Sequence, residues 1–371
     1  MRVGVIGGGQ LARMMIPPAV ALGLELRVLA EVEGSSASLA ATAVGDYRDE
    51  ATVLKFAAEV DVITFDHEHV PQPVLEALVA SGVAVRPGPH ALAVAQDKTV
   101  MRERLSAIGA PVPDWARVTD AGELGAFLAD HGGVAVVKTP RGGYDGKGVR
   151  VVRDASDADD WFMSAGEAGL LVEQYVPFRR ELAQLVARRP SGQLAAWPLV
   201  ETVQRDGVCA EVFAPAPHAG VLADEARALA ERIATELDVT GVLAVELFET
   251  DEGRLLVNEL AMRPHNTGHW SIDGAITSQF EQHLRAVLDL PLGDPSPLAP
   301  VSVMVNILGG PSGERMPDRY SQAMADRPEV KLHSYAKDSR PGRKVGHVTA
   351  TGDSLDDTVA RARAAAAFFE G

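Results

Sequence analysis

Two glutamates, Glu246 and Glu259, stand in apolar segments on either side of residues 250–253. Apolar runs joined by a short glycine-containing turn are typical of a β-hairpin. If the turn is symmetric about residues 252 and 253, residues whose numbers add up to 505 pair with each other, and the two carboxylates face one another. Opposed like charges destabilise a sheet unless a cation lies between them. Carboxylate oxygens suit Mg²⁺, with Mn²⁺ also possible, particularly metal carried by substrate phosphates. The alternative is a register shifted by a bulge, with one carboxylate in solvent.

A cluster of hydrogen-bond donors follows the second of these segments. It consists of Arg263, His265, Asn266 and His269. Guanidinium, imidazole and amide groups can all donate to anionic oxygens. The two patterns together predict a site that handles a metal and at least one anion.

The composition limits the classes of function. A chain of 371 residues with 46% hydrophobic residues predicts two or three domains with buried cores. The net charge of −16 opposes a general affinity for nucleic acid or anionic membranes, although small phosphates can still bind in local basic pockets. The one cysteine, Cys209, excludes an internal disulfide and is expected to be buried. We find no signal peptide and no long apolar stretch, so we expect a cytoplasmic protein.

The N-terminal segment predicts a parallel α/β sheet. Residues 2–6 form a buried-strand pattern, residues 7–9 are three glycines, and a helix pattern begins at Gln10. Strand patterns at 24–30 and 61–65, with helices between them, continue the sheet. The glycines and the free amides of the helix start predict an anion site.

The same glycines partly match a dinucleotide fingerprint. Gly7, Gly9 and Ala12 have its spacing, and Glu31 is placed to bind a ribose. This match alone is weak. Glu68 lies in the loop 66–69, at the carboxyl end of a strand where open α/β sheets place ligands. A helix-capping or surface role for Glu68 is equally compatible with that position.

A small lid is expected after the linker at residues 109–113. A strand pattern ending at Lys138 is followed by a glycine-rich loop at 141–148 and further strands at 149–152 and 170–175. The loop's amides and cations suit a flap that closes over phosphates, although it lacks the spacing of a P-loop. The alternative is a flexible loop with incidental charge.

The remaining chain predicts an antiparallel α+β domain. Strand patterns lie at 180–188, 194–203, 208–213 and 301–308, and helix patterns at 221–237 and 278–288. A basic run at 340–347 contains a Pro-Gly turn, and a solvated surface loop is one interpretation of it.

Several motifs together resemble the ATP-grasp superfamily and, within it, the ATP-dependent carboxylases of purine biosynthesis. They are Gly-Gly-Gly-Gln-Leu-Ala-Arg-Met at 7–14, Gly-Gly-Tyr-Asp-Gly-Lys-Gly at 142–148, Glu173-Gln174, the run 258–270, Ser-Gln-Phe-Glu at 278–281 and the run 340–347. The resemblance implies α/β and α+β architecture: an N-terminal Rossmann-like (pre-ATP-grasp) domain at 1–97, a linker helix and lid at 98–176, and a C-terminal ATP-grasp domain with the metal site at 177–371. Departures from the pattern include Ala12 in place of glycine, Asp-His-Glu in place of Glu-Phe-Glu at 66–68, and Met262 in place of proline.

The resemblance also implies an ATP site. Lys98 and Lys138 would contact phosphates, residues 173–176 would form the adenine-binding hinge, and Glu181 would hold the ribose. The full set implied for the nucleotide is Lys98, Lys138, Gly143, Tyr144, Asp145, Gly146, Lys147, Gly148, Val149, Glu173, Gln174, Tyr175, Val176, Glu181, Gln204, Asn258 and Glu259.

The implied reaction is an ATP- and bicarbonate-dependent carboxylation. Bicarbonate attacks the γ-phosphate to give carboxyphosphate, which delivers a carboxyl group, directly or as carbon dioxide, to the exocyclic amine of 5-aminoimidazole ribonucleotide. The products are N5-carboxyaminoimidazole ribonucleotide, ADP and phosphate. Asp145 would accept the amine proton. The catalytic candidates are Tyr144, Asp145, Arg263, His265, Asn266, His269 and Lys344, and the ribonucleotide candidates are Gly8, Gly9, Gln10, Leu11, Glu68, Asn266, Arg343 and Lys344. Related enzymes suggest a homodimer.

Three other functions remain open at this point. An NAD-dependent oxidoreductase would use the glycine turn but leaves the glutamate pair unexplained. A catalytically idle relative should have lost phosphate lysines or metal carboxylates, and Lys98, Lys138, Glu246 and Glu259 are all present. Another ATP-grasp ligase, such as a formate-dependent glycinamide ribonucleotide formyltransferase or a biotin carboxylase, would differ only in the acceptor site.

Overall fold

The computed structural model describes residues 1–143, 148–309 and 315–369. The predictions for Tyr144, Asp145, Gly146 and Lys147 lie outside the described residues, and so does the middle of the expected flap. The described chain forms a five-stranded, a four-stranded and a nine-stranded sheet. Among the described residues, no helix is both long enough and apolar enough to cross a membrane.

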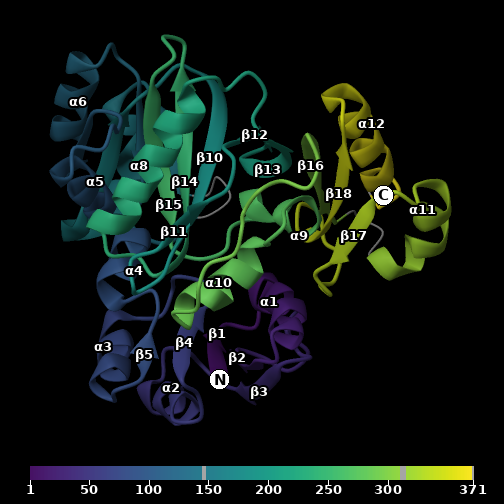
Figure 1. Cartoon of the computed structure of the whole chain (residues 1–371). Coiled ribbons are helices and arrows are strands. Elements are labelled where there is room, and N and C mark those ends of the chain that lie inside the picture. The colour runs from purple at the N-terminus through teal and green to yellow at the C-terminus, as the bar shows by residue number, and fades with distance from the viewer. Residues whose placement is uncertain (144–147, 310–314, 370–371) are drawn as a thin grey trace.

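The five-stranded sheet is parallel throughout, as predicted, and lies at the bottom of Figure 1. Its order is β3 (Ala41–Val44), β2 (Glu25–Ala30), β1 (Arg2–Ile6), β4 (Val62–Phe65) and β5 (Ala84–Val85). The sequence interpretation missed β3 and β5 because β5 has only two residues and the Ala-Thr-Ala-Val segment of β3 is not a run of strongly strand-forming residues. The helices that pack on this sheet are α1 (Gln10–Ala21), α2 (Glu50–Ala57), α3 (Gln72–Ala80) and, from far along the chain, α10 (Gln279–Val287).

Two helices, α4 (Pro89–Gln96) and α5 (Lys98–Ala107), lead to the lid sheet. Asp97 caps α5, since its Oδ1 accepts from the amides of Thr99 and Val100 at 3.0 and 3.3 Å. The lid sheet is antiparallel, in the order β6 (Trp115–Val118), β9 (Leu170–Gln174), β7 (Ala135–Lys138) and β8 (Val149–Val152), and it carries α6 (Ala121–Asp130) and α7 (Asp159–Ala165).

The nine-stranded sheet is the largest element of the fold. Its order is β15 (Leu255–Ala261), β14 (Gly241–Thr250), β10 (Phe178–Arg188), β12 (Val200–Arg205), β13 (Val208–Ala214), β16 (Val301–Leu308), β18 (Lys344–Gly352) and β17 (Lys331–Ser334), with β11 (Leu194–Ala196) beside β10. The helices of this part are α8 (Leu222–Glu236), α9 (Ser271–Gly274), α11 (Tyr320–Asp326) and α12 (Leu355–Ala366).

One sequence expectation for this sheet was wrong, and one open alternative fits only in part. The strand expected at 194–203 is two strands, because the chain leaves the ladder around Pro198, which has no amide to donate. The surface-loop interpretation of the basic run 340–347, which the sequence left open, fits only its first part: from Lys344 onward the chain is strand β18, paired with β16 and, from Gly346, also with β17. Each sheet draws its strands from one of the three predicted domains, whose boundaries at 97/98 and 176/177 stay a prediction.

Candidate active site

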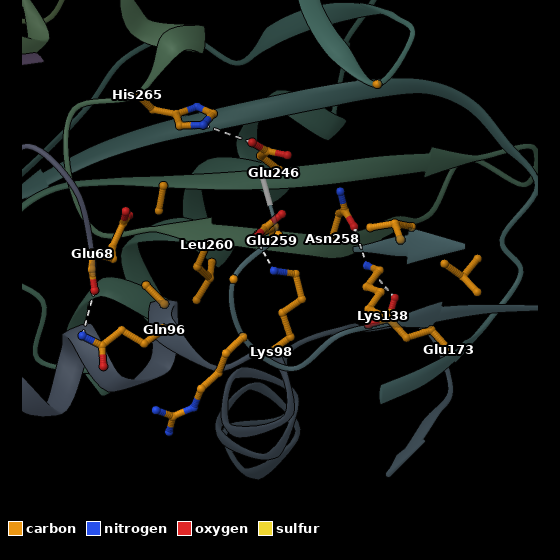
Figure 2. Close-up of a pocket in the computed structure, with 18 of the residues that line it drawn as sticks. Glu68, Gln96, Lys98, Lys138, Glu173, Glu246, Asn258, Glu259, Leu260 and His265 are labelled. Carbon is orange, nitrogen blue, oxygen red and sulfur yellow. Dashed lines mark hydrogen bonds and ion pairs between the residues drawn. The ribbon is translucent and has the colours of Figure 1, made fainter. Parts of the chain in front are cut away.

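A cavity of about 1020 Å³ lies between the lid sheet, the hairpin β14–β15 and the loop after β4. Figure 2 shows side chains from all three regions around it. Most of the described residues predicted for the site line this cavity. They are Glu68, Lys98, Lys138, Gly143, Val149, Glu173, Gln174, Tyr175, Val176, Glu181, Gln204, Glu246, Asn258, Glu259, Arg263, His265, Asn266 and Lys344.

The two glutamates of the hairpin face each other, but for a reason that the sequence interpretation missed. The turn is a three-residue loop closed by the Thr250 amide on the Arg254 carbonyl at 2.9 Å, so pairing near the turn would set Glu246 against Asn258. A β-bulge shifts the register between Glu246 and Leu247, and Glu246 pairs with Glu259. The bulge therefore brings the carboxylates together, instead of separating them as the alternative interpretation supposed.

The pair is electrostatically unbalanced. The pKa of Glu246 is raised to about 8, first by burial and then by the charges of Glu259 and Glu181, while Lys344 and Arg263 act in the opposite direction. Nearby carboxylates that resist ionisation are stabilised by a shared cation. The described residues contain no group of three or more His, Cys, Asp and Glu side chains placed to hold a metal alone. Two carboxylates with the remaining positions left to phosphates and water fit Mg²⁺, which rarely has an all-protein cage.

Lys98 reaches Glu259, one of the two opposed carboxylates, from helix α5. Its Nζ lies 3.3 Å from Glu259 Oε1, a contact that Figure 2 marks with a dashed line. The side chain is almost fully buried, so its charge is poorly screened by solvent. The cap at Asp97 fixes the start of α5 and thereby the direction of Lys98.

Lys138, at the end of β7, is held by two neighbours. Its Nζ lies 2.7 Å from Glu173 Oε2 and 3.2 Å from Asn258 Oδ1. Burial would raise the pKa of Glu173, but the nearby charges of Arg102 and Lys138 keep that pKa below its ordinary value. The Glu173 side chain is only 3% exposed, so although it lines the cavity its carboxylate is mainly occupied by the lysine and by Arg102.

The other predicted hinge and ribose residues lie at one end of the cavity. Gln174 and Tyr175 are exposed there, and Phe178 stacks on Phe248 with ring centroids 4.6 Å apart. Burial raises the pKa of Glu181, and a hydrogen bond with Gln204 opposes that rise. Apolar rings beside polar groups are typical of a site for a nucleoside.

The donor cluster after β15 is partly used within the chain. Arg263 Nε donates to Glu68 Oε2 at 2.7 Å, and Glu68 lines the cavity, so a ligand contact for Glu68 stays a prediction. His265 Nε2 lies 3.2 Å from Glu246 Oε1 and its Nδ1 lies 3.0 Å from Thr267 Oγ1. Burial lowers the pKa of His265 well below its ordinary value, so the ring is neutral, and we assign its one N–H to Nε2, which donates to Glu246.

His269 was predicted to be catalytic, but the structure buries it completely. Its Nδ1 accepts from Gln279 Nε2 at 2.9 Å, and Gln279 also holds the backbone of His265. The reason for the difference is that residues 266–268 form a short 3₁₀ turn, which directs His269 into the core while Asn266 stays at the cavity wall. His269 supports the loop from behind.

The two predicted residues of the basic run at 340–347 have different positions. Lys344 lines the cavity, close enough to lower the pKa of Glu246. Arg343 is exposed, does not line the cavity, and donates to the Asp338 carbonyl at 3.3 Å. Alternation along the start of β18 gives the two neighbouring side chains opposite directions.

The glycine turn does not line this cavity, and its amides are partly occupied. The Gly8 amide donates to Glu31 Oε2 at 3.0 Å and the Ala12 amide to Asp66 Oδ1 at 2.7 Å. A hydrogen bond from His67 and the Gly8 amide lower the pKa of Glu31 to about 2. A Cβ at Gly9 would come within 2.0 Å of Asp66 Oδ2. Of the predicted ribonucleotide residues, Gly8, Gly9, Gln10 and Leu11 thus lie at a separate corner, where Lys337 Nζ donates to Gln10 Oε1 at 2.6 Å.

Sequence reasoning missed several residues at this site. Arg102 gave no signal because a single arginine in a helix pattern is usually a surface residue. Val136, Phe248 and Leu260 line the cavity and were treated as core, since a strand pattern does not separate a core face from a ligand face.

Three sequence profiles match the chain in succession. The ribonucleotide synthetase preATP-grasp domain matches residues 1–96, the ATP-grasp domain matches residues 103–280, and the phosphoribosylaminoimidazole carboxylase C-terminal domain matches residues 302–361. The expected fold class is therefore confirmed.

The chain is 53% identical, over 98% of its length and 86% of the relative's, to N5-carboxyaminoimidazole ribonucleotide synthase of Mycobacterium tuberculosis. The crystal structure of an ADP complex of N5-carboxyaminoimidazole ribonucleotide synthetase is similar, with a TM-score of 0.90 and 34% identity over 98% of this chain and 96% of that one. The Aspergillus clavatus enzyme in complex with ADP and 5-aminoimidazole ribonucleotide has a TM-score of 0.88 and 30% identity over 99% and 98% of the two chains. The chain belongs to the N5-carboxyaminoimidazole ribonucleotide synthase family of ATP-grasp ligases.

Proposed function

We propose that this chain carries out the ATP-dependent carboxylation of 5-aminoimidazole ribonucleotide in the cavity under the lid. The observation that carries the proposal is that two buried lysines, Lys98 and Lys138, meet the opposed Glu246 and Glu259 in one cavity. An oxidoreductase built on the glycine turn is excluded by the family, and the occupied amides of Gly8 and Ala12 agree with that exclusion.

The nucleotide lies between the lid and the hairpin in this proposal. Its adenine occupies the end lined by Tyr175 and Phe248, and its phosphates extend toward Lys98 and Lys138. A magnesium ion held by Glu246 and Glu259 would neutralise charge on the phosphates during transfer. Lysines already positioned by carboxylates lose little conformational freedom when they exchange those partners for phosphate.

The carboxyl transfer uses the donor cluster. An oxygen of bicarbonate attacks the γ-phosphorus, the bond to the β–γ bridging oxygen breaks, and ADP leaves with that electron pair. Arg263 and Asn266 are placed at the wall to hold the resulting carboxyphosphate. His265 is neutral and its one N–H is used by Glu246, so in this proposal it orients that carboxylate and does not bind carboxyphosphate. The amine of the ribonucleotide then attacks the carboxyl carbon, the bond from that carbon to the phosphate oxygen breaks, phosphate leaves with the electron pair, and the amine proton passes to Asp145, the base that the family resemblance implies.

Lys344 is assigned to the acceptor and not to ATP. It lies beside Glu246 on a strand that belongs to the C-terminal family domain, and we assign it to the anionic acceptor. The homologous complex from Aspergillus clavatus holds ADP and 5-aminoimidazole ribonucleotide, which supports binding of both in one enzyme. The homodimer and the cytoplasmic location stay predictions, and light scattering after size exclusion would test the first.

The test is phosphate release from ATP in the presence of bicarbonate. We expect release to rise strongly with 5-aminoimidazole ribonucleotide and not with glycinamide ribonucleotide, and ¹³C-bicarbonate to label the product. Stimulation by glycinamide ribonucleotide with formate would instead indicate a formyltransferase.

A further inference from the structure

Arg102 is a completely buried arginine beside the phosphate site. It lies on α5 one turn after Lys98, so the two side chains share a face of the helix. It does not line the cavity and cannot touch a nucleotide. Its position directly behind two phosphate-binding side chains calls for a physical reason.

The guanidinium joins two separate parts of the site. Its Nε donates to Glu173 Oε1 at 2.6 Å, and its Nη2 donates to the Asn258 carbonyl at 2.7 Å. The other oxygen of Glu173 holds Lys138 Nζ at 2.7 Å. One side chain on α5 therefore contacts the lid strand β9 and the hairpin strand β15, and it reaches the ammonium of Lys138 through a single carboxylate.

The Asn258 carbonyl has a particular place in the hairpin. Asn258 is the extra residue of the bulge that sets Glu259 opposite Glu246. Bulge residues are left without regular ladder partners, so their carbonyls need another donor. Arg102 supplies that donor. The same guanidinium thus fixes the register of the carboxylate pair and the position of the lysine.

Fold stability alone does not explain this arginine. Removing a guanidinium from water is costly, and well-packed apolar residues often stabilise a core as well as a buried ion pair does. The Nη1 atom of Arg102 is buried without a hydrogen-bond partner among the described residues, which adds to that cost. The geometric precision of a planar fork is what an apolar residue lacks.

We propose that Arg102 is a positioning residue that aligns the phosphate site and the metal site with each other, acting on Lys138 through Glu173 and on Glu259 through the bulge at Asn258. The inference rests on the proposed function, because it assumes that Lys138 binds phosphate and that Glu259 binds metal. It predicts that one distant substitution disturbs both sites at once.

The experiment measures ADP binding by calorimetry, first with EDTA and then with Mg²⁺, for Arg102→Lys, Glu173→Gln and Lys138→Met. Arg102→Lys keeps the charge but loses the fork. We expect it to weaken metal-free ADP binding about tenfold and to reduce the further gain from Mg²⁺ by a similar factor, the order expected for losing a charge-assisted contact. Glu173→Gln should weaken ADP binding in EDTA. It should keep more of the gain in ADP affinity that Mg²⁺ brings, because Arg102 still donates to the Asn258 carbonyl of the bulge.

Arg188→Lys is the matched control. Arg188 is also mostly buried and also donates to one carboxylate and one backbone carbonyl, of Asp238 and Val239, at 2.8 and 3.1 Å. It should lower the melting temperature less, because Asp238 is mostly exposed, and it should leave both ADP measurements unchanged. Equal effects of Arg102→Lys and Arg188→Lys on ADP binding would overturn the proposal.

A double-mutant cycle separates this inference from the proposed function. If Arg102 acts through Lys138, the combined variant should bind metal-free ADP about as weakly as Lys138→Met alone. If the double variant instead loses ADP affinity by the product of the two single losses, Arg102 does not act through Lys138. Should Lys138→Met itself bind ADP normally, the phosphate role of Lys138 in the proposed function is wrong. If Arg102→Lys does not fold, Glu173→Gln still decides the first half, since normal ADP binding by that variant excludes positioning through Glu173.

Discussion

The glycine turn after β1 and the hairpin β14–β15 both predict ligand binding from sequence, but the structure treats them differently. At the turn, two amides donate to Glu31 and Asp66, so donors and acceptors of the chain satisfy each other. At the hairpin, Glu246 and Glu259 face each other and the pKa of Glu246 rises to about 8. The Gly8 and Ala12 amides already have charged partners, whereas the hairpin holds two carboxylates together at an electrostatic cost that a cation would remove. An unfavourable arrangement of charges in the folded chain is therefore a better guide to a ligand site than a sequence motif alone.

Neutralising the hairpin carboxylates tests this difference most directly. Glu246→Gln and Glu259→Gln should each lower magnesium-dependent ATP turnover by about a hundredfold or more, because a stabiliser of transition-state charge is lost. The assay is phosphate release at limiting Mg²⁺. Glu252→Gln, at the exposed turn of the same hairpin, is the control and should retain normal turnover. Near-normal rates in both cavity variants would reject the metal assignment.

The next effect concerns the acceptor. Lys344→Ala should lower kcat/KM for 5-aminoimidazole ribonucleotide by about a hundredfold, since a charge-assisted contact to an anion contributes about 1.5–3 kcal/mol. ADP titration should be nearly unchanged. Arg343→Ala should cost less than about tenfold, because Arg343 is exposed outside the cavity. Weaker nucleotide binding with normal use of the ribonucleotide would assign Lys344 to the ATP half instead.

A smaller effect should appear in the pH dependence of stability. Folding raises the pKa of Glu246 from 4.5 to about 8, so the folded state binds its proton more tightly and loses stability as the pH rises through that interval. Glu246→Gln cannot ionise. Without ligands it should melt near the wild-type temperature at pH 5 and on the order of 2 °C higher at pH 9. Parallel melting curves across this range would mean that the carboxylate ionises freely. Added Mg²⁺ and ADP should remove the difference.

The smallest expected effect lies at the glycine turn. Glu31→Gln should lower the free energy of unfolding by about 1 kcal/mol, because a half-exposed charged acceptor of the Gly8 amide is lost. ATP kinetics should not change. Chemical denaturation with a parallel kinetic assay tests both parts, and Glu33→Gln, on the exposed segment that follows, serves as control. A large loss of ATP turnover would show that the turn belongs to the nucleotide site.

Long periodic segments of the fold were predictable, and so was the opposition of Glu246 and Glu259. The strand at Val301–Leu308 and the short, largely exposed strand at Val149–Val152 have the expected bounds, because runs rich in valine and isoleucine identify strands well. What escaped prediction depends on tertiary contacts. Nothing local indicates that His269 turns into the core, or that Arg102 lies buried between two strands. The bulge was considered only as a threat to the metal site.

The two strands of the hairpin have different numbers of residues between the turn and the paired glutamates, and this limits how the length of the hairpin can vary. Four positions separate Glu246 from the closing residue Thr250, whereas five separate Glu259 from Arg254. The bulge absorbs the difference. Deleting one residue from the outer part of β15 would give arms of equal length in which the carboxylates still meet without a bulge. Deleting two would carry Glu259 past its partner. Over evolution, or in redesign, the outer end of this hairpin can thus shorten by one residue while the two carboxylates still face each other, but the bulge carbonyl that Arg102 holds would be lost.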